Sequence, residues 1–67
     1  MSPDKLIMMA NQIATFFDSQ PDGKAAENVA AHLRDFWAPE MREKLKDHVA
    51  AGGEGLRPTV SQAAAHL

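Results

Sequence analysis

Apolar residues recur along this chain at the three- and four-residue spacing that places side chains on one face of an α-helix. No segment shows the sustained alternation of apolar and polar residues that is typical of a half-buried strand, and nothing repeats. The pattern predicts an all-α fold, a single small helical domain of three main helices plus a short C-terminal helix. We expect these helices at residues 3–18, 24–37, 39–51 and 58–66.

Turn-forming residues set the expected boundaries. Ser2 and Pro3 suit an N-cap and the first position of a helix. Pro39 and Pro58 can each begin a helix in the same way, and a proline also disfavours helical geometry in the residue before it. Gly52–Gly53 is typical of a helix end, and we interpret the glycine-rich segment there as a flexible connection.

The first helix carries more apolar surface than one core requires. Its apolar residues span roughly 180° of a helical wheel, whereas about 100° is enough to cover one core. A chain of 67 residues buries only about 60% of its unfolded surface, and without cysteine it has no disulfides to compensate. We therefore expect this helix to contact apolar material on two sides. One side is its own bundle, and the other is either the surface of a partner protein, which we favour, or an exposed edge.

All the aromatic residues lie in two adjacent pairs, Phe16–Phe17 and Phe36–Trp37. Neighbouring helical residues point about 100° apart, so both members of a pair rarely enter one small core. We expect Phe17 and Phe36 in the core, while Phe16 and Trp37 fit the core and an interface equally well. Tryptophan and phenylalanine are enriched in interface cores. The predicted partner-interface residues are Met8, Met9, Phe16 and Trp37.

Charged and chemically reactive residues indicate no catalysis. The formal net charge is −2, with both signs interspersed, which argues against a nucleic-acid partner. His32, His48 and His66 lack the spacing of a helical metal site, so we interpret them as structural or surface residues. No serine has a signature of an activated nucleophile. We predict no catalytic, cofactor-binding or metal-binding residue, and no signal peptide or membrane span, so we expect a cytoplasmic protein.

Three stretches of the chain, in this order, resemble a known family. They are residues 5–17 (KLIMMANQIATFF), 32–42 (HLRDFWAPEMR) and 52–58 (GGEGLRP). The family is the small delta subunit of bacterial NAD-dependent formate dehydrogenase, the soluble molybdenum or tungsten type. Ala38 and Arg57 depart from its pattern, since an aspartate commonly precedes the proline at both places and would cap the following helix.

The resemblance implies a non-catalytic accessory subunit of a complex that oxidises formate to carbon dioxide and reduces NAD⁺. It implies that the partner is the large catalytic subunit, in a hetero-oligomeric complex. It also implies that other chains hold the bis-molybdopterin guanine dinucleotide (bis-MGD) cofactor with molybdenum or tungsten, the iron–sulfur clusters, FMN and NAD. Two alternatives stay open: a transient assembly factor for insertion of the molybdenum cofactor, and a free-standing homo-oligomeric helical regulator.

Overall fold

The computed structural model describes residues 3–67, which form four helices and no strand. The helices are α1 (Pro3–Asp18), α2 (Ala25–Phe36), α3 (Pro39–Ala50) and α4 (Pro58–Ala64). The all-α prediction is confirmed, and the expected boundaries agree with the observed ones to within two residues. The expected cap at Ser2 lies outside the described residues.

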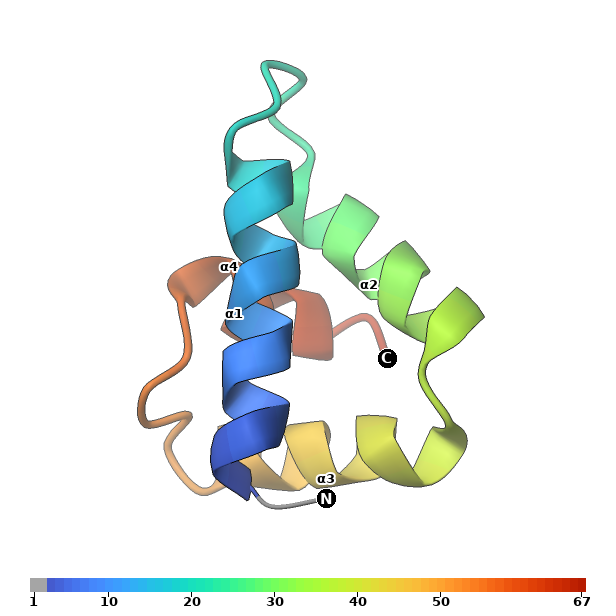
Figure 1. Cartoon of the computed structure of the whole chain (residues 1–67), viewed down its shortest axis with the longest axis vertical. Coiled ribbons are helices and arrows are strands. Elements are labelled where there is room, and N and C mark those ends of the chain that lie inside the picture. Colours follow the sequence, from blue (N-terminus) through green and yellow to red (C-terminus); the bar gives the residue numbers. More distant parts are fainter. Residues whose placement is uncertain (1–2) are drawn as a thin grey trace.

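The helices pack around one small core (Figure 1). α1 and α2 lie side by side, joined by a turn, and α3 runs across one end of this pair. α4 lies behind α1 and packs mainly against α2. Every helix therefore contacts each of the other three, which lets a short chain enclose its apolar side chains.

The core draws buried residues from all four helices. α1 contributes Leu6, Ala10 and Ala14, and the two alanines allow neighbouring helices to approach its backbone closely. The remaining members of the core are Val29, Ala30, Leu33, Trp37, Leu45, Val60 and Ala63. α3 supplies only Leu45. The buried residues of α1, α2 and α4 recur at three- and four-residue spacing, as the sequence pattern predicts for helices that each bury one face.

Proline and glycine act at the helix ends as predicted. Ala38, before Pro39, has extended geometry (φ −63°, ψ 149°) and begins α3 without a side-chain cap. At the other end of α3, Gly52 and Gly53 have φ values of +122° and +66°, which side chains with a Cβ rarely adopt. The Gly53 N–H donates to the carbonyl oxygen of His48 at 2.9 Å. This bond satisfies one of the carbonyls left open at the helix end.

The glycine-rich segment after α3 is not a loose connection, which corrects our interpretation of the sequence. Asn11 in the middle of α1 holds it through two hydrogen bonds. The Asn11 side-chain amide donates to the Gly55 carbonyl at 2.8 Å, and the Arg57 N–H donates to Asn11 Oδ1 at 2.9 Å. His48 Nε2 lies 2.7 Å from the Glu54 carbonyl oxygen. The loop is thereby fastened to both α1 and α3.

Asp18, at the end of α1, fixes the start of α4. Its carboxylate accepts a hydrogen bond from the Thr59 hydroxyl at 2.5 Å and one from Arg57 Nε at 3.1 Å. These hydrogen bonds, with Thr59 contributing most, hold the pKa of Asp18 below its usual value of 3.8. Arg57 makes no side-chain cap for α4. The residue that departs from the family pattern therefore ties two helices together instead of capping one.

Candidate protein-interaction surface

Most of the wide apolar arc of α1 is covered by the chain itself. Met9, Ile13 and Phe17 are half-buried against the edge of the core. On the opposite side of the helix, Ile7 lies beside the fastened loop, where a Cβ on Gly55 would come within 3.7 Å of its side chain. The edge of the arc at Ile7 therefore faces the protein's own loop, and the edge at Phe16 is the one left open to a partner.

The predicted interface residues do not lie on one surface. Met8 and Phe16 are 55% and 62% exposed, so both are available to a partner. Met9 is half-buried against the core. Trp37 is only 7% exposed and belongs to the core, so its assignment to an interface is corrected.

Phe36 takes the exposed position that we had assigned to Trp37. It was expected in the core, yet it is 74% exposed. The reason is the end of α2: Phe36 is the last helical residue, and Trp37 is already extended (φ −91°, ψ 140°). Leaving the helical path turns the Trp37 indole inward, and the larger apolar side chain is the one buried. Pro39 disfavours helical geometry in Ala38, so α2 has to end close to Trp37, and this is the sequence signal that points to the exchange.

Aromatic rings form a continuous row across α1 and α2, which we call the aromatic ridge (Phe16, Phe17, His32 and Phe36). Phe16 and Phe17 have ring centroids 5.1 Å apart at an interplanar angle of 79°. The Phe17 and His32 centroids are 6.2 Å apart, and those of His32 and Phe36 are 4.8 Å apart. All three spacings lie in the range of favourable aromatic contacts. The ridge therefore has two exposed ends, Phe16 and Phe36, joined by half-buried rings.

A shallow apolar hollow of about 170 Å³ lies beside the ridge, lined by Ile13, Phe16, Phe17 and His32. No charged side chain lines it. Hollows of this kind receive the apolar anchor residues that dominate the energy of protein interfaces. The ridge and its hollow together form the candidate interaction surface.

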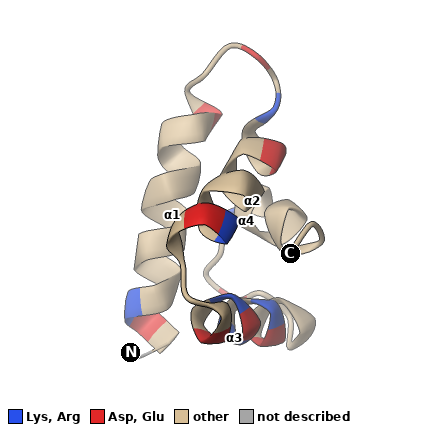
Figure 2. Cartoon of the chain, turned by 90° about the vertical axis from the view of Figure 1, so that its right-hand side faces the viewer, with Lys and Arg blue, Asp and Glu red and all other residues tan. Residues whose placement is uncertain are grey.

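The charge distribution separates this surface from the rest of the molecule. α1 has no charged residue between Leu6 and Phe17. Figure 2 shows this uncharged stretch of α1 and, below it, α3, which carries charged residues along most of its length. Exposed helix faces in proteins are usually rich in Lys, Arg, Asp and Glu. The uncharged outer face of α1 is therefore typical of a surface that another protein covers.

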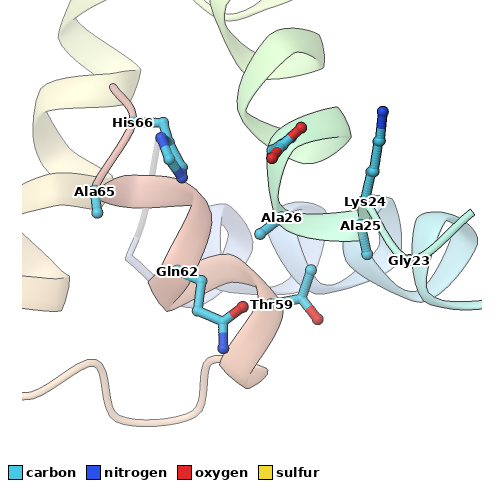
Figure 3. A pocket seen from close by; sticks show the side chains of 9 residues that line it. Gly23, Lys24, Ala25, Ala26, Thr59, Gln62, Ala65 and His66 are labelled. Carbon is cyan, nitrogen blue, oxygen red and sulfur yellow. The ribbon is translucent and has the colours of Figure 1, made fainter.

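A larger hollow of about 530 Å³ lies between the start of α2 and α4 (Figure 3). Its walls are mixed: Lys24 and Glu27 are charged, and Thr59, Gln62 and His66 are polar. Lys24 and Glu27 carry opposite charges, so the hollow has no single sign that would attract an ion. The Thr59 hydroxyl in its lining donates to Asp18 and so links α4 to α1, and the lining as a whole is not predominantly apolar.

The histidines have separate surroundings. His32 lies in the aromatic ridge, and His48 binds the carbonyl of Glu54. The backbone carbonyl of His66 accepts a hydrogen bond from Arg34 Nη1 at 2.8 Å. Within residues 3–67, no three His, Cys, Asp or Glu side chains gather closely enough to hold a metal ion. Since the sequence also has no cysteine, this donor set does not fit an iron–sulfur cluster.

Comparison with known protein families shows to which family this chain belongs. The model of the NADH-dependent formate dehydrogenase delta subunit FdsD matches residues 5–64. The chain belongs to this family. No curated protein and no solved structure gave a match. The resemblance read from the sequence is confirmed, and the matched range of this delta-subunit family member includes the aromatic ridge and the loop held by Asn11. None of the helices described for it is both long and apolar enough to cross a membrane.

Proposed function

We propose that this protein is a non-catalytic accessory subunit of a cytoplasmic NAD-dependent formate dehydrogenase. In this role it binds the large catalytic subunit and stabilises it. The observation that carries the proposal is the family match over residues 5–64 together with the exposed aromatic ridge. A delta subunit that presents exposed apolar rings is suited to binding another protein.

Binding of this kind stabilises the partner by mass action. A protein that binds only the folded form of a partner raises the partner's free energy of unfolding. The increase is about 2.7 kcal/mol when the binder is present at 100 times its Kd. In this proposal the bis-MGD cofactor, with molybdenum or tungsten, the iron–sulfur clusters, FMN and NAD all belong to the other chains. This subunit contributes a surface, and the exposed ends of that surface are Phe16 and Phe36.

The proposal is tested by co-expression with the formate dehydrogenase chains. We expect the tagged large subunit to retain this protein at constant stoichiometry in fully active, cofactor-loaded enzyme. Enzyme that is prepared without it should lose activity faster on warming. A protein found on immature enzyme but missing from the mature form would be an assembly factor instead. A chain that never binds the dehydrogenase and forms a stable homo-oligomer would be a free-standing regulator.

A further inference from the structure

We propose that Phe16 and Phe36, the two ends of the aromatic ridge, insert into a concave, uncharged apolar surface of the large catalytic subunit. This inference rests on the proposed function and adds to it the place of contact and the chemistry of the partner's surface. Four properties of the described residues support it: the protrusion of the two side chains, the lack of charge around them, their poor fit to a second copy of this chain, and the area that an interface needs.

The first property is protrusion. Phe16 and Phe36 are 62% and 74% exposed, the largest values among the exposed large hydrophobic residues of the described chain. Burying a phenylalanine side chain fully is worth about 1.5–3 kcal/mol. Side chains that stand out this far are covered best by a surface that is hollowed to receive them. The partner surface is therefore concave.

The second property is charge. The outer face of α1 between Leu6 and Phe17 is uncharged, and the hollow beside the ridge has no charged lining. A charged partner side chain placed here would lose water without gaining a counter-charge, which is costly. The complementary surface is therefore apolar and uncharged, and one of its own apolar side chains fits the hollow between Ile13 and His32.

The third property is the poor fit of a second copy of this chain. In a two-fold dimer whose axis passes through the ridge, ridge meets ridge, and the hollow beside the ridge is already lined by Phe16 itself. Another mainly apolar hollow, about 240 Å³, lies between α3 and α4 and is lined by Val49, Ala50 and Ala64 among others. Unless both copies insert reciprocally, a ridge placed there makes a head-to-tail contact, which forms open chains unless its rotation closes a ring. A different, larger protein is the better occupant.

The fourth property is area. A standard interface covers about 800 Å² on each partner, which is about a fifth of the 4190 Å² accessible surface of this chain. An aromatic side chain buries about 150–250 Å² when it is fully covered. Because Phe16 and Phe36 are already partly buried, the two phenyl groups supply less than half of the interface area. The rest must come from the flanks of the ridge. Met8 lies on one flank, about 80° around α1 from Phe16.

The test compares charged variants in the co-expressed complex. We expect Phe16→Asp and Phe36→Asp each to lower retention by the tagged large subunit at least tenfold, and the double variant to abolish it. Gln62→Asp is the matched control, since it adds the same charge at an exposed position on α4, outside the ridge and the hollow beside it. Phe16→Leu keeps an apolar anchor and should bind within about threefold of wild type.

A second measurement needs no variant. Oxidative footprinting of the wild-type complex should reduce labelling of Phe16 and Phe36 at least fivefold relative to the isolated chain, with Ala50 and its neighbours unchanged. If wild-type protein is not retained at all, the proposed function fails. If wild-type protein is retained but the double variant or the footprint is unaffected, the position of the interface is wrong. A wild-type homodimer that Phe36→Asp dissociates would assign the ridge to a second copy.

Discussion

α1 and α3 differ in how many residues they bury and in how charged their exposed surfaces are. α1 buries three residues, contacts a fastened loop and still leaves Phe16 exposed. α3 buries only Leu45, and half of its residues are charged. Its ion pair between Lys46 and Glu43, at 3.4 Å, lies at the surface, where such pairs contribute little to stability. The charged surface of α3 is therefore well solvated without a partner, whereas α1 keeps an exposed surface that is uncharged and partly apolar.

The comparison teaches that total hydrophobicity does not locate an interface. The wide apolar arc of α1 suggested a partner along the whole helix, but the chain covers most of that arc itself. What remains is the small part that no other segment of the chain reaches. The following substitutions test how firmly each region is held, beginning with the largest expected effect.

The largest difference is expected between alanine substitutions of Trp37, which is buried, and of Phe36, which is exposed. Trp37→Ala should destabilise the fold by about 3–5 kcal/mol, because it leaves a large cavity in the core. Phe36→Ala should change stability by less than about 1 kcal/mol, since its ring is already exposed. Urea unfolding followed by circular dichroism measures both. Equal losses would contradict the assignment of these two side chains.

The attachment of α3 depends on one buried residue. Leu45→Ala should cost about 2–5 kcal/mol, enough to unfold much of a chain of this size. Lys44→Ala, at the neighbouring exposed position, should change stability by less than about 0.5 kcal/mol. Thermal unfolding of the two variants separates packing from helix propensity. If both variants melt like wild type, α3 is held by something other than Leu45.

The loop that covers one side of α1 is held by Asn11. Asn11→Ala removes both bonds, to Gly55 and Arg57, and should cost about 1–3 kcal/mol. Exchange of the Arg57 amide hydrogen should become faster by about tenfold in the same variant. Gln12→Ala, one residue further along α1 and exposed, is the control and should alter neither quantity. An unchanged exchange rate in Asn11→Ala would show that the loop is held without this residue.

The smallest effect is expected from acid. The pKa of Asp18 is lowered by its hydrogen bonds to Thr59 and Arg57, so the unfolded chain takes up the proton before the folded one does. This contribution to stability is complete above the unfolded value of 3.8 and is lost as the pH falls through the lower, folded value. Stability measured from pH 5 to pH 2 should fall less steeply in Asp18→Asn. A slope identical to that of wild type would show that Asp18 does not contribute to the pH dependence of stability.

The sequence alone determined the helices, their approximate ends and the family. Helical periodicity and the local geometry of Pro39, Pro58 and Gly52–Gly53 act over a few residues, so they can be read without knowledge of the fold. The buried faces of α2, α3 and α4 follow from the same periodicity. The exposure of Phe16 and Met8 reflects their position on α1, while their place in an interface stays a prediction.

The tertiary structure decided what depends on residues far apart or on the direction in which a helix ends. Asn11 meets Gly55 and Arg57 across 44 and 46 positions of the sequence, a pairing that no local pattern contains. The choice between Phe36 and Trp37 depends on the path of one extended residue after α2. His32 joins the ridge only because α1 and α2 pack side by side. Local sequence sets the preferences of each segment, but only packing decides which apolar side chains are left outside.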